Sequence, residues 1–287
     1  MYAAGAPGRD EMLATPVTRR LLLLFLVCAL CQGYAWWRSG REKEAREAEA
    51  PPSKLDGTGE GVGGDYAPPA PSDYVVFRDG YELGFNADTH QPDWVAYRLT
   101  KEKLMHPNAG RTNDFRPDEE IKESATLADY TRSGYDRGHM APAADMKGSE
   151  REMSQSFLLT NMSPQMPSCN RGVWGRLEDL IRKMAMNEHS IYVVTGPIHD
   201  EERKLKTIGK SEVWVPDFYY KVILDETPPR KMIAFIVPNK GSDKELWKFA
   251  LTVDEVEEAT QLDFFPGTEG EDELESGLDL KAWGLKQ

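Results

Sequence analysis

The sequence predicts an α+β fold built around a sheet, and three observations lead to this class. Short apolar runs with strand composition outnumber the helical segments. The expected helices are interspersed irregularly, whereas a doubly wound parallel sheet alternates strand and helix. The chain has 287 residues, of which 40% are hydrophobic and 29% charged. This is enough for a sizeable core in one large domain or two small ones.

The folded part is expected to begin near Tyr74. The segment YVVFRDGYELGFN places strand residues on both sides of Asp79 and Gly80, which is typical of a hairpin. Residues 93–100 (DWVAYRLT) alternate as a half-buried strand does. The remaining apolar runs predict strands at 157–161, 191–198, 218–224 and 232–239. Helices are expected at 149–157, 168–187 and 252–260.

The N-terminal 37 residues contain an apolar segment that suggests targeting or anchoring. Arg19 and Arg20 precede it, and no residue from Leu21 to Trp37 is charged. The run LLLLFLVCAL fits a signal-peptide core, and the full stretch barely reaches the length of a membrane span. We therefore expect residues 1–37 to be a signal peptide or membrane anchor, with contact to a membrane through residues 21–37. The domain would be membrane-anchored or exported. A mitochondrial location is the alternative, although mitochondrial presequences are usually poor in acids and this one has Asp10 and Glu11.

Two further segments are expected to lie outside the core. Residues 38–73 hold five Pro, six Gly and three Ser, a composition that predicts a linker. The chain has a formal net charge of −13, and residues 252–287 carry eleven acids but only two bases. We expect residues 267–287 to form a solvated acidic tail. The folded domain would then occupy residues 74–266.

Cysteine, histidine and charge content exclude several classes of function. Cys28 and Cys31 lie in the apolar segment and Cys169 is alone after it, so no disulfide framework or Cys-rich zinc module is expected. The five histidines show no HxxxH pairing, which argues against a zinc hydrolase. The acidic balance argues against a passive basic coat for nucleic acid. Residues 130–190 nevertheless hold eight bases and seven acids, which leaves room for a local basic groove.

The most informative stretch is Asp136-Arg137-Gly138-His139. Glycine frees the backbone, arginine is a fixed cation suited to phosphate, and a neutral imidazole accepts a proton near pH 7. Taken alone, four residues are a weak signal, because a single histidine is more often structural.

A second polar group lies in the expected helix at 168–187. At 100° per residue, Asn170 falls in the middle of the apolar stripe, and Glu178 falls at its edge two turns later. Asn170 is either the N-cap of this helix or an oxygen ligand for a hard cation, with Glu178 reaching the same site through water.

Together these residues make the sequence similar to the DNA/RNA non-specific endonucleases with a ββα-metal active site. The resemblance rests on DRGH at 136–139, on Asn161, and on N-x-G-x-W-x-x-L-E at 170–178. It is extended by TGPI at 195–198, VPDFYYKVIL at 215–224, FIVPN at 235–239 and DFFP at 263–266. It covers roughly residues 74–266 and implies a central, mostly antiparallel sheet flanked by helices. Gln261 stands where relatives tend to have glycine.

The resemblance also implies roles for individual residues. His139 would be the general base, and Asn170 would be the direct ligand of one Mg²⁺, with Mn²⁺ as a substitute. Glu178 would hold metal-bound waters, Arg137 would contact phosphate, and Asn161 would fix the local geometry. An upstream arginine would also clamp the phosphate, and of the two candidates, Arg111 and Arg116, Arg111 is preferred.

The implied activity is metal-dependent, sugar-non-specific hydrolysis of phosphodiester bonds in DNA and RNA, bound through their phosphates. Family members are often dimers, so a homodimer is a further expectation. Two alternatives stay open. One is a non-catalytic nucleic-acid binder, and the other is a cysteine hydrolase that uses Cys169 with His139, since a thiol before a helix start can be acidified.

Overall fold

A computed structural model describes residue 68 and residues 72–200 and 203–285. A seven-stranded sheet dominates them, with the order β1-β2-β3-β6-β9-β10-β11 and antiparallel pairing throughout. Its strands are β1 (Tyr74–Arg78), β2 (Tyr81–Asn86), β3 (Gln91–Thr100), β6 (Ser190–Ile198), β9 (Phe218–Asp225), β10 (Lys231–Pro238) and β11 (Ala250–Leu251). The expected α+β class with an antiparallel sheet is confirmed.

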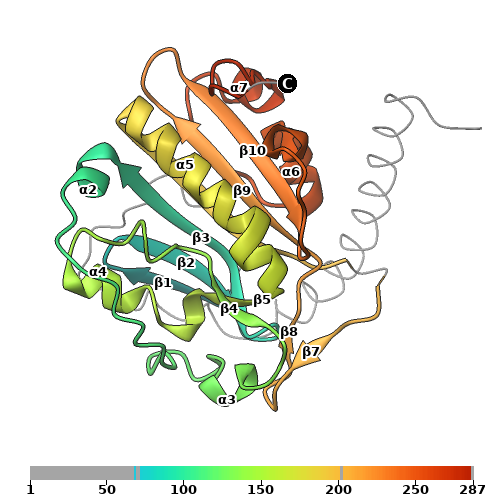
Figure 1. The fold of residues 1–287 in the computed structure, drawn as a ribbon. Helices are drawn as coiled ribbons and strands as arrows, with labels where there is room; N and C mark the ends of the chain where they lie inside the picture. The colour runs from blue at the N-terminus through green and yellow to red at the C-terminus, as the bar shows by residue number, and fades with distance from the viewer. Residues whose placement is uncertain (1–67, 69–71, 201–202, 286–287) are drawn as a thin grey trace, which may run out of the picture.

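Two short ribbons and several helices complete the described fold (Figure 1). The ribbons are β4 (Asp136–His139) with β5 (Met162–Gln165), and β7 (Thr207–Ile208) with β8 (Val213–Trp214). The longer helices are α5 (Gly175–Glu188), α6 (Val253–Thr260), α4 (Glu150–Gln155) and α7 (Glu271–Ser276). The remaining helical segments are α2 (Lys101–Met105), α3 (Leu127–Tyr130), η2 (Leu159–Asn161), η3 (Cys169–Trp174) and η4 (Leu246–Phe249).

Two predicted elements differ from the structure. The strand predicted at 157–161 is wrong, because the 3₁₀ turn η2 occupies Leu159–Asn161. The backbone closes a local turn there, in which the N–H of Asn161 donates to the carbonyl of Leu158. The helix expected at 168–187 is divided: η3 is a π-helical turn with a kink at Gly172, and the regular helix α5 starts at Gly175. A wheel drawn at 100° per residue therefore does not apply between Asn170 and Glu178.

The two faces of the sheet are covered by different helices. Alternate residues of a strand point to opposite faces. On β9, Tyr219 and Ile223 belong to the core cluster that contains the α5 residues Leu177 and Ile181. Tyr220, Val222 and Leu224 belong to the cluster that contains the α6 residues Val253 and Val256. Helix α5 thus lies on one face and α6 on the other, and in Figure 1 α5 crosses in front of the sheet while α6 and α7 lie beyond β10.

The segment expected as an acidic tail packs against the sheet as far as it is described. Helix α7 contacts α6 and β10. Trp283 is 5% exposed and its indole N–H donates to the carbonyl of Met232. This packing explains why residues 267–285 follow the domain surface in spite of their charge.

The N-terminal expectations fall outside the described residues. The structure does not describe residues 21–37 or nearly all of the predicted linker at 38–73. Among the residues that are described, no helix is both long and apolar enough to cross a bilayer.

Candidate active site

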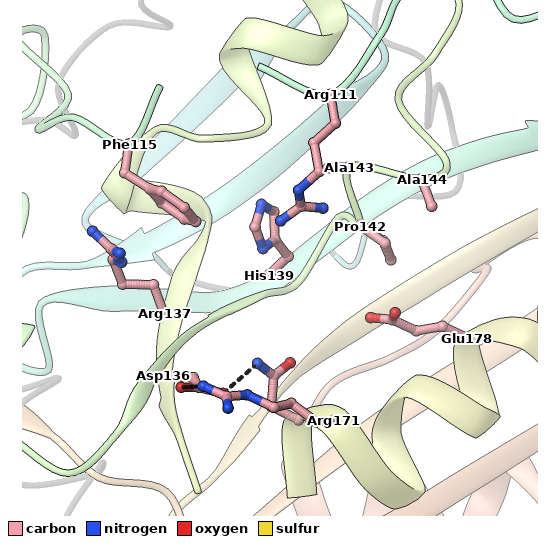
Figure 2. Close-up of a pocket in the computed structure, with 11 residues that line it drawn as sticks. Arg111, Phe115, Asp136, Arg137, His139, Pro142, Ala143, Ala144, Arg171 and Glu178 are labelled. Carbon is pink, nitrogen blue, oxygen red and sulfur yellow. Dashed lines mark hydrogen bonds and ion pairs between the residues drawn. The ribbon is translucent and has the colours of Figure 1, made fainter. Parts of the chain in front are cut away.

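A cleft of about 290 Å³ opens between the β4–β5 ribbon and the start of α5. The elements β4, β5 and η3–α5 form a strand–strand–helix unit in which the DRGH sequence is the first strand. Figure 2 shows the side chains that converge there. The cleft is lined by Arg111, Phe115, Asp136, Arg137, His139, Pro142, Ala143, Ala144, Asn170, Arg171 and Glu178.

His139 lies at the end of β4 in an aromatic slot. Its ring forms T-shaped contacts with the rings of Phe115 and Phe157, with centroid distances of 5.5 and 5.0 Å. Burial, together with the positive charges of Arg111 and Arg137, lowers the pKa of His139 to about 3. The imidazole is therefore neutral at physiological pH, and its Nε2 has no hydrogen-bond partner among the described residues. A neutral ring with an unpartnered nitrogen is able to take up a proton.

Arg111 and Arg137 lie on either side of His139 (Figure 2). The Arg137 guanidinium stacks over Phe115 at 4.0 Å from the ring centroid, and that of Arg111 over Phe157 at 5.0 Å. The aromatic rings hold the two guanidinium groups in place without neutralising their positive charge. The other candidate, Arg116, instead binds Asp114 and the carbonyl of Ser154, and does not line the cleft. The geometry thus favours Arg111 of the two.

Asn170 lies across the cleft on η3 and is half-buried. Its amide donates to Asp136 at 3.0 Å, and Arg171 donates twice to the same carboxylate at 2.9 and 2.7 Å. The N-cap interpretation of Asn170 is wrong, since Ser168 occupies the cap position. With its N–H₂ group engaged by Asp136, the amide oxygen of Asn170 is the atom left to bind a ligand.

Glu178 lines the same cleft from α5, so Asn170 and Glu178 are brought together in spite of the kink at Gly172. Burial raises the pKa of Glu178, and attraction to Lys221 opposes this rise. Lys221 is fully buried, with its ammonium 4.5 Å from the ring centroid of Trp174. The ammonium thus favours the charged form of the carboxylate, although the effect of burial on the pKa is the larger one.

Sequence reasoning missed the groups that support these side chains. Asp145 accepts hydrogen bonds from Arg182 at 2.8 Å and from Tyr97 at 3.1 Å, and it adds a negative charge beside Glu178. Lys221 carried a usable signal, because it is a single cation inside the apolar strand FYYKVIL. A charge in such a strand is rare unless it is paired.

Asn161 does not line the cleft but holds the chain next to His139. It is fully buried, accepts from the N–H of Ala141 at 2.9 Å, and donates to the carbonyls of Ala141 and Ser156 at 3.0 and 2.8 Å. These bonds join Asn161 to the backbone just after β4, at Ala141, and to the end of α4, at Ser156. The arrangement suits a residue that fixes local geometry.

The structure explains glycine at position 138 by close packing and not by the backbone freedom that the sequence suggested. It is not among the described residues with positive φ, but a Cβ there would lie 2.2 Å from the Gln165 side chain. The close pairing of β4 with β5 therefore requires glycine between Arg137 and His139.

The cysteine alternative is contradicted by the surroundings of Cys169. Its side chain is fully buried in the core beneath α5 and does not line the cleft. Burial raises the pKa of its thiol to about 12, the opposite of what an activated nucleophile needs.

Asn170 and Glu178 could hold a hard divalent cation in the cleft. Asn170 and Glu178 supply one amide oxygen and one carboxylate to the same wall of the cleft, and hard cations prefer oxygen ligands. Within the described residues the cleft contains no group of three His, Cys, Asp or Glu ligands. This donor set fits Mg²⁺, which commonly keeps several waters and shares substrate phosphates.

Comparisons with known proteins agree with this geometry. The family model for DNA/RNA non-specific endonucleases matches residues 65–271. The chain belongs to this family. A mitochondrial EXOG nuclease of Danio rerio is 37% identical over 206 residues, which are 66% of this chain and 60% of that protein. The chain thus spans less than two thirds of that relative's length.

Other family members give the same result. A nuclease of Nostoc is 36% identical over 68% of this chain and 74% of its own length. Human mitochondrial endonuclease G is 32% identical over 66% of this chain and 68% of its own. A solved structure titled as the EndoG/EndoGI complex superposes with a TM-score of 0.65 at 31% identity, covering 76% of this chain and 93% of that one. The family resemblance and the ββα-metal fold are therefore confirmed.

Proposed function

We propose that this endonuclease-family chain is a metal-dependent nuclease that hydrolyses phosphodiester bonds of DNA and RNA without regard to the sugar. The observation that carries the proposal is one cleft that is lined by His139, by the two arginines Arg111 and Arg137, and by the oxygen-bearing side chains of Asn170 and Glu178. Substrate would bind through its phosphates, and affinity would fall steeply with salt.

His139 is the general base in this mechanism. Its neutral imidazole takes a proton from the attacking water. A phosphate seated between Arg111 and Arg137 offsets the two positive charges that depress the pKa of the ring. Substrate binding therefore strengthens the base when it is needed. The arginines also hold the phosphate in line with the water.

Asn170 and Glu178 would hold Mg²⁺, or Mn²⁺ in its place, with the amide oxygen of Asn170 as the direct ligand and the carboxylate of Glu178 as the supporting group. Such a cation stabilises the charge that develops on the phosphoryl group and on the leaving 3′ oxygen. Asp136 orients Asn170 by its 3.0 Å hydrogen bond, and Asn161 positions the chain beside His139. Attraction to Lys221 favours the charged form of Glu178.

Incubation of the purified full chain with closed circular plasmid and with RNA, in Mg²⁺ or in chelator, tests the proposal. Linearisation of the circle establishes endonuclease action, because a strict exonuclease has no end to attack. Loss of cleavage in chelator establishes metal dependence. A chain that binds nucleic acid in chelator and cuts nothing in Mg²⁺ or Mn²⁺ is the non-catalytic binder instead, and the proposal fails.

We propose the mitochondrion as the compartment. Relatives from Danio rerio, Saccharomyces cerevisiae and Homo sapiens are named mitochondrial nucleases, which favours this alternative over export. The apolar segment at 21–37 then directs the chain to that organelle. Fractionation with N-terminal sequencing tests this. Recovery of the chain in the secretory membranes would restore the signal-peptide or anchor expectation.

A homodimer is the assembly proposed by analogy with the family. Light scattering on the purified chain measures its mass directly. A mass near 32.4 kDa would show a monomer and contradict the proposed homodimer.

A further inference from the structure

Five acidic side chains gather where α6, α7 and the loop between them meet. Asp254 and Glu257 come from α6, Asp263 from the loop, and Glu271 and Glu275 from α7. Carboxylate oxygens of Asp254, Glu257 and Glu275 lie within 4.8 Å of one another, as do those of Asp263, Glu271 and Glu275. Glu275 belongs to both sets. We call these five residues the C-terminal carboxylate cluster.

Glu275 is the reason this cluster differs from an ordinary acidic surface. It is 7% exposed, and its Oε1 atom is buried without a hydrogen-bond partner. Burial, together with the negative charges of Glu257 and Glu271, raises the pKa of Glu275 to about 8. A buried carboxylate without a partner is costly unless a cation or proton joins it.

Among the described residues, no side-chain cation pairs with the cluster. Within residues 72–200 and 203–285, none of its five carboxylates forms an ion pair. The nearby guanidinium of Arg230 pairs with Glu269, outside the cluster. Two cluster members accept a backbone N–H: Glu257 from Phe264 at 2.8 Å and Glu271 from Gly267 at 2.7 Å. Each of these carboxylates keeps a second oxygen for another partner.

We propose that the C-terminal carboxylate cluster binds one Ca²⁺, with Glu275 as its central ligand. Ca²⁺ takes six to eight oxygen ligands in flexible geometry, and carboxylates supply them singly or in pairs. Five carboxylates from three segments match this requirement. Mg²⁺ demands near-ideal octahedral geometry and gives up its waters reluctantly, so it fits a wide carboxylate set less well.

This site is separate from the catalytic cleft. Helix α6 packs on the sheet face that carries Val222 and Leu224, whereas α5 and the cleft residue Glu178 belong to the opposite face. The bound cation would join α7 to α6 and so fasten the C-terminal segment to the sheet. Its role is structural, and the inference does not depend on the nuclease proposal.

Calorimetric titration of the full chain with CaCl₂ alone tests the site. The Asn170→Ala background removes the proposed ligand in the cleft, so that binding there does not confuse the result. We expect one Ca²⁺ per chain, with a dissociation constant at or below about 1 mM, the range of weak calcium modules. Glu275→Gln, added to this background, should abolish the binding. It keeps the side-chain shape and removes a buried charge, so folding should survive.

Two further variants complete the test. Asp254→Asn with Asp263→Asn changes only exposed ligands and should weaken Ca²⁺ binding at least about tenfold, as loss of charged ligands does. Glu273→Gln is the matched control, because it removes an exposed α7 acid outside both triads and should change nothing. Ca²⁺ should also raise the melting temperature of the wild type but not of Glu275→Gln. An absence of Ca²⁺ binding up to about 10 mM, tenfold beyond the weak-module range, or binding that survives Glu275→Gln, would overturn the proposal.

Discussion

The side-chain amide of Asn170 donates a 3.0 Å hydrogen bond to Asp136, and this bond joins the helical turn η3 to strand β4. It links the residue proposed to hold the metal with the strand that carries the proposed base. We therefore propose Asp136 as a positioning residue, although it also lines the cleft.

Replacement of Asp136 by alanine should loosen the metal site. The Asn170 amide loses the acceptor that sets its orientation, and such supporting partners are typically worth 10–100-fold in metal affinity. The Mg²⁺ concentration for half-maximal cleavage should rise accordingly. Arg171→Met is the matched control, since it removes the ion pair to Asp136 but leaves the Asn170 hydrogen bond. Because Arg171 is 73% exposed, its loss should shift the Mg²⁺ requirement much less. Equal shifts in both variants would contradict the positioning role.

Substitution of His139 and Asn170 should separate the base from the metal ligand. His139→Ala should lower turnover by about 10²–10⁴-fold, the usual contribution of a general base, and leave Mg²⁺ binding nearly intact. Asn170→Ala should weaken Mg²⁺ binding itself, so that excess Mg²⁺ restores a little activity to this variant and none to His139→Ala. Titration of cleavage rate against Mg²⁺ measures both effects. If Cys169→Ser were inactive while both variants kept metal-dependent cleavage, the assignment would be wrong.

Asp129 should make the stability of the fold depend on pH. It is buried, and although burial opposes its ionisation, hydrogen bonds from Ser211 and Thr126 hold its pKa below the usual range. A depressed pKa in the folded state contributes stability above the unfolded pKa of about 3.9, and this is lost as pH falls through the folded value.

The Asp129→Asn variant tests this linkage. It should be less stable than the wild type by about 1–3 kcal/mol between pH 5 and 7, a range that lies above the unfolded pKa. The difference should shrink below about pH 4 as the wild-type carboxyl is protonated. Urea unfolding at several pH values measures it. Glu119→Gln, an exposed acid, should show no such pattern. A difference that stays constant down to about pH 2 would exclude ionisation of Asp129 as its source.

Replacement of Gln261 by glycine should stabilise the fold. It ends α6 in the left-handed region with φ of 56°, a conformation that costs residues with a Cβ about 1–2 kcal/mol. Gln261→Gly should therefore raise the free energy of unfolding by about 0.5–1 kcal/mol after the entropy of glycine is deducted. Glu258→Gly, inside the same helix, should lower it by about 1 kcal/mol. Denaturant unfolding of the wild type and of the two variants measures these differences in the free energy of unfolding. A destabilised Gln261→Gly would show that the side-chain bond of Gln261 to the Glu258 carbonyl outweighs the strain.

Periodicity and composition determined most of the sheet. The runs at 191–198, 218–224 and 232–239 became β6, β9 and β10 to within one residue at either end, because a strand buried on both faces is apolar along its whole length. The run at 157–161 failed because Asn161 and its neighbours satisfy their backbone within a tight turn, which composition does not reveal.

The sequence alone also indicated the family, through DRGH, Asn161 and the 170–178 pattern, and with it the side chains that we propose carry the chemistry. What only the tertiary structure decided was how each of them is supported. Asp136 under Asn170, Lys221 beside Glu178, and the burial of Cys169 depend on segments far apart in the chain. Hydrogen bonds and desolvation act across space, and no local pattern encodes the distance between two such segments.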